Sequence, residues 1–287
     1  MVGLNNRSGG ATGQRLETAL LLRAYSAGLF PMADTREATD IFWVEPRRRG
    51  VLALDNFHLS RSLAKVLKQE RFRHSHDVAF EAVIQACSAS APGRDQSWIN
   101  HSILDAYCRL HAEGHAHSIE TWDREGRLVG GLYGVRLGAA FFGESMFSRR
   151  TDASKAALAH LVVRLRAGGF QLLDTQFLTA HLARFGGHEV KRSHYMIALD
   201  SAVRQRADWQ ALDRMEGVSP QPAGVLLSAP GAATGAAPGA ATGAGAGAAG
   251  AADRGDRAGD DFFLPADVLG GLGPSGKRIV QLLSQTS

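Results

Sequence analysis

The chain has 287 residues, of which 45% are hydrophobic and 21% charged, enough for one large domain or two small ones with a real core. This is the composition of a globular protein, and it excludes a chain that is disordered throughout. The formal net charge of +4 and the pI near 9.3 favour a polyanionic partner, although many proteins with such an excess bind no nucleic acid.

Cysteine usage and the apolar runs narrow the class further. The two cysteines, Cys87 and Cys108, lie in stretches with a helical pattern, where free cysteine usually behaves as a small buried hydrophobe. We therefore expect no disulfide. No apolar run reaches membrane-spanning length, and the polar stretch Asn5 to Arg15 does not resemble a signal peptide. A cytoplasmic protein without membrane contact is the default expectation.

The N-terminal part is predicted to be a disordered leader over 1–14 and a small domain over 15–56. The leader is rich in glycine, asparagine and serine and has almost no apolar periodicity. Beyond it, apolar residues recur at helical spacing up to Gly28, a candidate helix C-cap, and Phe30-Pro31 ends the helix. A strand over 41–44 follows.

A basic helix is predicted over 59–68, at the start of a larger domain over 57–212. It carries Arg61, Lys65 and Lys68 at positions i, i+4 and i+7, which places three cations on one face. Such a face could contact phosphates, but in most helices it is only a solvated surface.

From His115 onward the pattern predicts antiparallel strands, then a helix and a further strand. The strands are expected over 116–122, 127–135 and 139–142. The helix over 153–167 ends at Gly168-Gly169, and the last strand covers 170–176. An α+β fold follows from this order.

The C-terminal part is predicted to be an Ala/Gly-rich linker over 213–260 and a short segment over 261–287. Residues 231–252 are almost entirely Ala, Gly, Thr and Pro without charge, too monotonous for a specific core. The amphipathic run from Gly276 to Leu283 could dock on the body as a short helix.

Polar groups stand where two apolar strands are expected to end. Glu144 follows Phe-Phe-Gly, and Asp174 and Gln176 follow Leu-Leu, as expected where strands open onto a pocket. Residues 174 and 176 should share a strand face, so that a carboxylate and an amide could act on one ligand.

Several separate motifs occur in an order that resembles one protein family. The central ones are Gly130-Gly131-Leu132-Tyr133-Gly134-Val135, Gly143-Glu144-Ser145-Met146-Phe147-Ser148 and Asp174-Thr175-Gln176. Others are Ala24 to Pro31, Trp43 to Pro46, Ser97 to Ile99 and His115 to Glu120. Together they resemble the bacterial leucyl/phenylalanyl-tRNA-protein transferases.

The resemblance implies an acetyltransferase-like mixed sheet with flanking helices and an aminoacyltransferase that needs no cofactor. The implied reaction moves Leu or Phe from aminoacyl-tRNA to the α-amino group of proteins with N-terminal Lys or Arg, which marks them for degradation. Whether Met is also transferred stays open. A monomer suffices for this chemistry.

By the same resemblance, Asp174 matches the essential carboxylate and Gln176 the neighbouring amide. Since a neutral amide is a poor base, we favour a positioning and electrostatic role, with Asp174 helping to attract the cationic acceptor. Glu144 and Ser145 match residues that contact the aminoacyl group or the acceptor. The apolar pocket for the transferred side chain matches Leu132, Phe141 and Leu173.

Aromatic residues near the terminal adenosine of the tRNA match Tyr25 and Trp98, where a ring could stack on the base. Met32 departs from the family, which commonly has Trp there, so Trp43 could complete the platform. The helix with Arg61, Lys65 and Lys68 matches a docking site for the tRNA acceptor arm.

No metal is predicted. Of the nearby histidines only His115 and His117 should share a face, and two ligands do not make a site.

Two other functions stay open. An acyl-CoA-dependent N-acetyltransferase would need a glycine-rich phosphate loop before the helix at Ala153, where the chain has Arg149-Arg150-Thr151-Asp152. A non-catalytic tRNA-binding protein would have no need of Asp174, Gln176 and Glu144 together.

Overall fold

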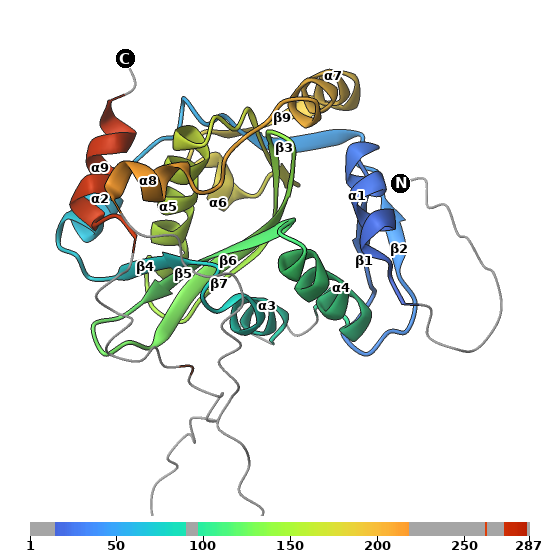
Figure 1. Ribbon diagram of the computed structural model, residues 1–287, viewed down its shortest axis with the longest axis horizontal. Helices are drawn as coiled ribbons and strands as arrows, with labels where there is room; N and C mark the ends of the chain where they lie inside the picture. Colours follow the sequence, from blue (N-terminus) through green and yellow to red (C-terminus); the bar gives the residue numbers. More distant parts are fainter. Residues whose placement is uncertain (1–14, 90–96, 218–261, 263–272, 286–287) are drawn as a thin grey trace, which may run out of the picture.

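The computed structural model describes residues 15–89, 97–217, 262 and 273–285. The predicted leader over 1–14, and most of the predicted linker over 213–260, lie outside these residues. The described part is a mixed α+β fold with one large sheet and helices on both of its faces (Figure 1).

The large sheet has seven strands in the order β4-β5-β6-β7-β8-β3-β9. In chain order these are β3 (Arg48–Leu52), β4 (Arg73–His76), β5 (Ala116–Trp122), β6 (Leu128–Leu137), β7 (Ala140–Ser148), β8 (Leu172–Gln176) and β9 (Gly187–Lys191). All neighbours are antiparallel except β7 and β8, which run parallel because α5 connects them. A two-stranded sheet of β1 (Phe30–Met32) and β2 (Phe42–Val44) stands beside it.

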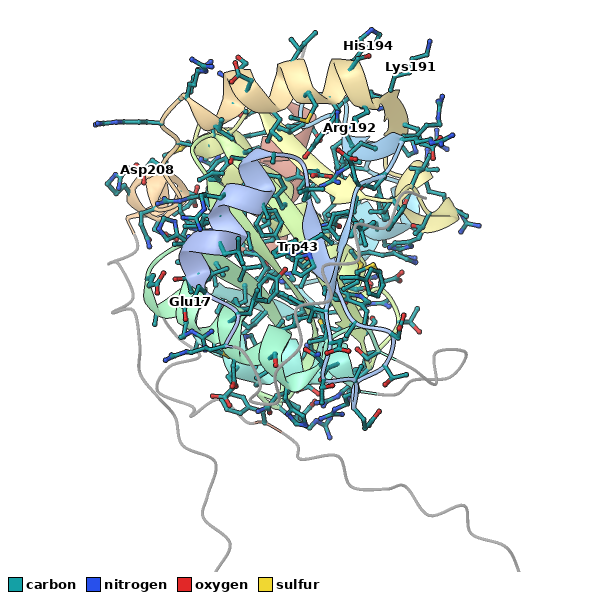
Figure 2. All side chains as sticks on the ribbon, turned by 90° about the vertical axis from the view of Figure 1, so that its right-hand side faces the viewer. Glu17, Trp43, Lys191, Arg192, His194 and Asp208 are labelled. Carbon is teal, nitrogen blue, oxygen red and sulfur yellow. The ribbon has the colours of Figure 1, made fainter. Side chains whose placement is uncertain are left out.

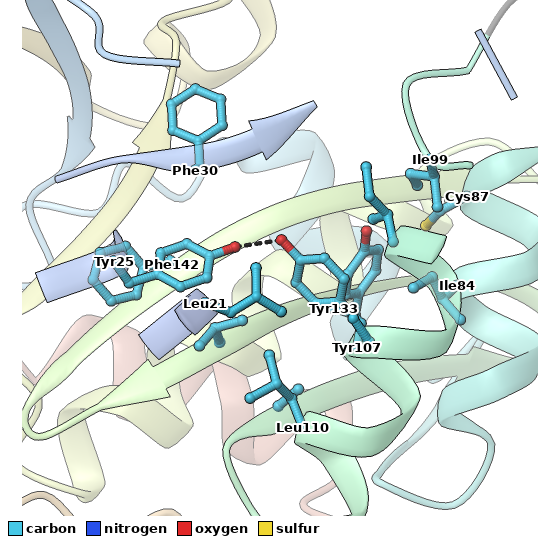
Figure 3. Packing of buried hydrophobic residues seen from close by; sticks show 14 of the residues in the cluster. Leu21, Tyr25, Phe30, Ile84, Cys87, Ile99, Tyr107, Leu110, Tyr133 and Phe142 are labelled. Atoms are coloured by element: carbon cyan, nitrogen blue, oxygen red, sulfur yellow. Dashed lines mark hydrogen bonds between the residues drawn. The ribbon is translucent and has the colours of Figure 1, made fainter. Parts of the chain in front are cut away.

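Helices cover the large sheet on both faces, and each face has its own apolar core. The helices are α1 (Thr18–Ser26), α2 (Arg61–Lys68), α3 (Phe80–Ser88), α4 (His101–Ala112), α5 (Ala153–Ala167), α6 (Ala180–Ala183), α7 (Arg192–Val203), α8 (Ala211–Glu216) and α9 (Gly276–Ser284). Residues of α1, α3 and α4 share one core with Tyr133 and Phe142 of the sheet (Figure 3). Residues of α2, α5 and α9 share the other with Leu132 and Phe141.

The N-terminal segment is joined closely to the rest of the fold. Leu21 of α1 and Phe30 of β1 are buried in the core that α3 and α4 also form. Strand β3, within the segment predicted as a separate domain over 15–56, lies between β8 and β9 in the large sheet. The division into two domains therefore stays a prediction.

Two predicted boundaries fall inside elements of the structure. Strand β7 does not end at residue 142 but continues to Ser148, because its second half stays hydrogen-bonded to β6. The predicted boundary between body and linker after residue 212 cuts through α8, in which Asp213 is buried and paired with Arg164.

Cys87 and Cys108 form no disulfide. None of the helices within the described residues is long and apolar enough to cross a membrane.

Candidate active site

A fork between two parallel strands opens the sheet at its centre. Strands β7 and β8 pair from Ala140 with Leu172 to Phe142 with Asp174, and then separate. Beyond that point β7 pairs with β6, and β8 with β3. A cavity of about 330 Å³, lined by residues of both strands, lies at the fork.

Each strand of the fork carries one extra residue. In β7, Tyr133 and Gly134 of β6 face Ser145 and Gly143, which leaves Glu144 as the additional residue. Such bulges re-aim side chains and are common beside active sites. The sequence predicted Glu144 at the end of a strand. In the structure it lies at a bulge inside β7.

In β8 the additional residue is Thr175, since Gly50 and Val51 of β3 face Gln176 and Asp174. Gln176 has φ of 54°, in the left-handed region that a residue with a side chain seldom adopts. Gly50 makes room for this turn, because a β-carbon there would lie 2.7 Å from the backbone of Phe177. The left-handed backbone of Gln176 and the absence of a side chain at Gly50 together allow the Gln176 side chain to line the cavity.

The Glu144 carboxyl group is held by hydrogen bonds from three side chains. Tyr25 donates from its hydroxyl to Oε1 at 2.8 Å, Tyr107 to Oε2 at 3.2 Å, and the Gln176 amide nitrogen to Oε1 at 2.9 Å. The two tyrosine hydroxyls also hydrogen-bond each other (Figure 3). Burial, and to a smaller extent the charge of Asp174, raises the pKa of Glu144 to about 8.

Protonation of Glu144 also fits the count of hydrogens in this cluster. Burial raises the pKa of Tyr25 and Tyr107 well above 10, so both hydroxyls stay protonated. Tyr25, Tyr107 and Glu144 make three mutual oxygen contacts, and two hydroxyl protons can fill only two of them. A proton on Glu144 supplies the third: Glu144 then donates to one tyrosine hydroxyl, and that hydroxyl donates to the other tyrosine instead of to Glu144.

The Asp174 carboxylate lies behind the cavity rather than in it. It is fully buried and is not among the cavity-lining residues. Arg49 donates from Nε and Nη2 to the two oxygens at 2.9 and 2.7 Å, Tyr195 donates from its hydroxyl at 2.6 Å, and the backbone N–H of Gln176 donates at 2.8 Å. Asp174 and Gln176 therefore do not face one ligand together, because the bulge at Thr175 separates their side chains.

The Arg49 guanidinium is fixed on every side. Its Nη1 donates to the Gly28 carbonyl at 3.0 Å, and its Cζ lies 4.8 Å from the ring centres of both Phe30 and Tyr195. Its pKa is raised, since the attraction of Asp174 outweighs the lowering effect of burial. Asp174 is thus a neutralised, immobile anchor for the backbone of Gln176.

The wall of the cavity is mostly apolar. It includes Leu132, Met146, Leu158, Leu161, Leu173 and Leu182, together with Phe30, Met32, Trp98 and Phe177. Ser145 also lines it. Phe141 does not: it is fully buried and stacks on Trp209, with ring centres 5.5 Å apart.

Of the aromatic residues expected near a nucleotide, only Trp98 lines the cavity, next to Met32. Tyr25 is fully buried, packs on Phe142 at 4.7 Å and directs its hydroxyl to Glu144. Trp43 does not line the cavity and lies in the middle of the face that α1 and the β1–β2 ribbon form (Figure 2).

Three buried polar atoms at the cavity have no hydrogen-bond partner within the described part of the chain. They are the hydroxyls of Tyr133 and Thr175 and Nε2 of His181. Burial lowers the pKa of His181, so its ring is neutral at physiological pH. A ligand with polar groups could satisfy these atoms, which are costly to leave unpaired.

A family model described as leucyl/phenylalanyl-tRNA protein transferase matches residues 51–200, and a model of the N-terminal domain of the same transferase matches 14–47. The chain belongs to the leucyl/phenylalanyl-tRNA-protein transferase family.

Curated relatives in this family are close in sequence. The leucyl/phenylalanyl-tRNA-protein transferase of Rhizorhabdus wittichii is 61% identical over 188 residues, which cover 66% of this chain and 75% of the relative. That of Zymomonas mobilis is 53% identical over 206 residues, covering 70% and 76%. Among solved structures, L-PGS from Bacillus licheniformis aligns with a TM-score of 0.38 and 11% identity over 55% of this chain and 65% of that chain.

The stretches matched by the transferase family include most of the site but not all of it. Glu144, Asp174 and Gln176 fall within the longer match, and Tyr25 within the N-terminal one. Arg49 falls between the two matches.

The cations of α2 stand apart from the cavity of this transferase. Arg61, Lys65 and Lys68 are exposed on α2 and do not line the cavity. Helix α2 is linked to it through α5, which it contacts and which contributes Leu158 and Leu161 to the wall.

Sequence reasoning missed Arg49, Tyr107 and Tyr195. Arg49 had one signal, a cation directly before the apolar run of β3, although its partner is 125 residues away in the chain. Tyr107 and Tyr195 are single tyrosines on helices and carry no local sign of their hydrogen bonds. Within the described residues, no group of three or more His, Cys, Asp or Glu side chains could hold a metal ion.

Proposed function

We propose that this protein transfers Leu or Phe, with Met as a further candidate, from aminoacyl-tRNA to the α-amino group of proteins with N-terminal Lys or Arg. The observation that carries the proposal is the fork cavity, in which an apolar wall meets the hydrogen-bonded pair Glu144 and Gln176, in a chain of the transferase family. The product would carry a new N-terminal residue that marks it for degradation.

The chemistry needs little from the protein beyond positioning. The amine nitrogen of the acceptor forms a bond to the carbonyl carbon of the aminoacyl ester, the ester C–O bond breaks, and the ribose oxygen leaves with the proton that the amine loses. Because the ester is already activated, no ATP is required. The enzyme must hold the two reactants together and stabilise the developing oxyanion.

Gln176 is the side chain best suited to hold the attacking amine. Its amide nitrogen donates to Glu144, and its amide oxygen accepts no hydrogen bond from the described residues. The oxygen can therefore accept from an N–H of the acceptor at the fork. Glu144 fixes the orientation of this amide, since it takes the amide nitrogen as a donor.

Asp174 supports Gln176 from behind as a positioning residue. Its bond to the backbone N–H of Gln176 helps to maintain the left-handed turn, and Arg49 and Tyr195 hold the carboxylate in place. Since Arg49 neutralises the carboxylate, a role in fixing Gln176 accounts for this geometry better than attraction of a cationic acceptor.

The apolar wall suits an unbranched or aromatic side chain of the donor. Leu132, Leu173 and Met146 offer hydrocarbon surface, and a polar aminoacyl group would lose its hydrogen bonds to water without replacement. Trp98 and Met32 are the candidates to contact the terminal adenosine, and the cations of α2 to contact the acceptor arm.

The sheet supports an acetyltransferase-like fold, but an acyl-CoA donor is disfavoured. In such enzymes the backbone N–H groups at the start of this helix would bind the pyrophosphate of the donor. Here α5 begins after Asp152, so that a carboxylate, paired with Lys155 at 2.6 Å, stands at this place. We expect a monomer in the cytoplasm.

The test is transfer of radiolabelled leucine from charged tRNA to a peptide with N-terminal Arg, beside a peptide with N-terminal Ala. Gln176→Met, which keeps the size of the side chain and removes its amide, should abolish most of the labelling. Labelling of both peptides would contradict the proposed acceptor. Tight tRNA binding without any labelling would favour the non-catalytic tRNA-binding protein instead.

A further inference from the structure

The C-terminal helix α9 lies outside both stretches matched by the family and packs against the basic helix α2. Ile279, Val280 and Leu283 of α9 are buried in the same apolar cluster as Leu63 and Leu67 of α2. The two helices lie side by side at one end of the molecule, and α1 lies at the opposite end (Figure 1). A helix from outside the matched stretches therefore packs on α2.

The backbones of the two helices are in direct contact at Gly276. A β-carbon at this position would overlap the carbonyl group of Leu67, so only glycine permits the approach. Ser275 caps the start of α9 by accepting from the backbone N–H of Arg278 at 3.3 Å. Lys277 follows Gly276, and Lys68 follows Leu67. Because Gly276 and Leu67 are in contact, the two lysines belong to the same region of the surface.

The cations of this region differ from the neighbouring Arg278 in that they have no ion-pair partner among the described residues. Within the described residues, Arg61, Lys65, Lys68 and Lys277 form no salt bridge, and all four are exposed. By contrast, Arg278, next to Lys277, is paired with Glu216 of α8 at 2.8 Å. Arg278 thus fastens α9 to the body, and Lys277 stays available.

We propose that α9 and α2 form one RNA-docking surface, in which Lys277 is a fourth cation beside Arg61, Lys65 and Lys68. The partner is the phosphate backbone of the tRNA donor, and this inference rests on the proposed function. Helix α2 has eight residues, too few to be stable alone, so the packing of α9 also holds the three cations of α2 in one arrangement. Neutralising phosphates with a fixed set of cations releases counterions and drives binding.

The first experiment compares Lys277→Glu with Arg206→Glu in the full chain. Arg206 is exposed between α7 and α8 and forms no salt bridge among the described residues, so it controls for the change in net charge. Binding of uncharged tRNA is measured at several salt concentrations. Lys277→Glu should weaken binding roughly five- to tenfold at low salt and reduce the slope of log K against log salt by about one. Equal binding by the two variants would overturn the proposal.

The second experiment moves α9 without changing any charge. Gly276→Leu should clash with the Leu67 backbone and displace the helix, and tRNA binding should weaken at least as much as in Lys277→Glu. Ser284→Ala, at the exposed end of α9, is the matched control. Tighter tRNA binding by Gly276→Leu would mean that α9 covers the basic surface instead of extending it, which also contradicts the proposal.

A short donor separates docking from chemistry. Leucyl-adenosine carries the ester but no acceptor arm, so the loss in Lys277→Glu should be confined to transfer from leucyl-tRNA. If the unaltered protein used neither donor, the proposed function would fail, while the binding comparison would still decide the role of α9. An equal loss with both donors would place Lys277 in the transfer step and not in docking, against this inference.

Discussion

Two buried Arg–Asp pairs with nearly the same geometry serve different parts of the molecule. Arg49 and Asp174 lie behind the cavity, and Arg164 and Asp213 join α5 to α8. In each pair two nitrogens of the guanidinium donate to the carboxylate, at 2.7 to 3.0 Å in the first and at 2.6 and 2.8 Å in the second. Both pairs are almost inaccessible to solvent. The interaction itself therefore does not distinguish a functional pair from a structural one.

The remaining partners of each pair make the distinction. Around Asp174 they are Tyr195 and the backbone N–H of Gln176, a residue with strained φ that faces the cavity. Around the pair of α5 and α8 they are the carbonyl of Trp209 and the ring of His76, which fix only buried structure. A buried ion pair indicates a functional site when one of its partners is a strained residue that reaches a cavity.

The largest expected effect is on stability, and it should be shared by the two pairs. Asp174→Asn and Asp213→Asn each leave a buried arginine without its anion, and we expect each to lower the free energy of unfolding by about 3 to 5 kcal/mol. Urea denaturation followed by circular dichroism measures this. A loss below about 1 kcal/mol in either variant would show that its arginine finds water or another partner.

Transfer activity should then separate the pairs. Per folded molecule, Asp174→Asn should reduce kcat for leucine transfer about 100-fold or more, because a small displacement of Gln176 misplaces the amine. Asp213→Asn should keep kcat within a factor of about three. The measurement is single-turnover transfer below the unfolding temperature of both variants. Equal activity losses would remove the functional distinction between the pairs.

The dependence of stability on pH sharpens the comparison at the cavity. Since the pKa of Glu144 is raised from 4.5 to about 8, the folded protein binds more protons than the unfolded chain between these values. The contribution of Glu144 to the free energy of unfolding should therefore be highest below about pH 4.5. It should decline as the pH rises from there to about 8, by ~1.4 kcal/mol per pH unit at most. Glu144→Gln should lose this part of the decline, as measured by urea titrations at several pH values. The same slope in both proteins would contradict the raised pKa.

The smallest effect on stability is expected for cations that are neither buried nor paired. Lys65→Ala combined with Lys68→Ala should change the free energy of unfolding by no more than about 0.5 kcal/mol. The same variant should weaken tRNA binding and reduce its salt slope by up to about two. Fluorescence anisotropy with labelled tRNA, alongside urea denaturation, measures both. An unaltered salt slope would exclude α2 from the docking surface.

The elements with local signals could be predicted from the sequence. Helix α5 has the predicted bounds of 153 to 167, because Gly168-Gly169 terminates it, and β5 has the predicted bounds of 116 to 122. Gln176 and Glu144 were correctly predicted to lie beside a pocket, since polar residues after apolar strand segments are unusual in a core.

Features that depend on pairing between distant segments could not be predicted. The bulges at Glu144 and Thr175 exist only relative to β6 and β3, and an alternating pattern within one strand does not reveal them. The burial of Asp174 depends on Arg49, whose strand pairs with β8 only in the folded chain. For this reason the sequence pattern placed Asp174 on the face of Gln176, whereas the structure buries it behind the cavity.

The bulge at Glu144 also reverses the odd–even alternation of β7. Before it, Phe141 faces the α5 side and Phe142 the α3 side; after it, the even-numbered Met146 faces α5 and the odd-numbered Phe147 faces α3. One strand can thus fill both cores along its first half and still present Met146 to the cavity along its second. Because Glu144 is the extra residue of the bulge, removing it alone would restore regular alternation and leave the other side chains of β7 on their present faces. The added residue therefore supplies the carboxyl group of the cavity without disturbing either core.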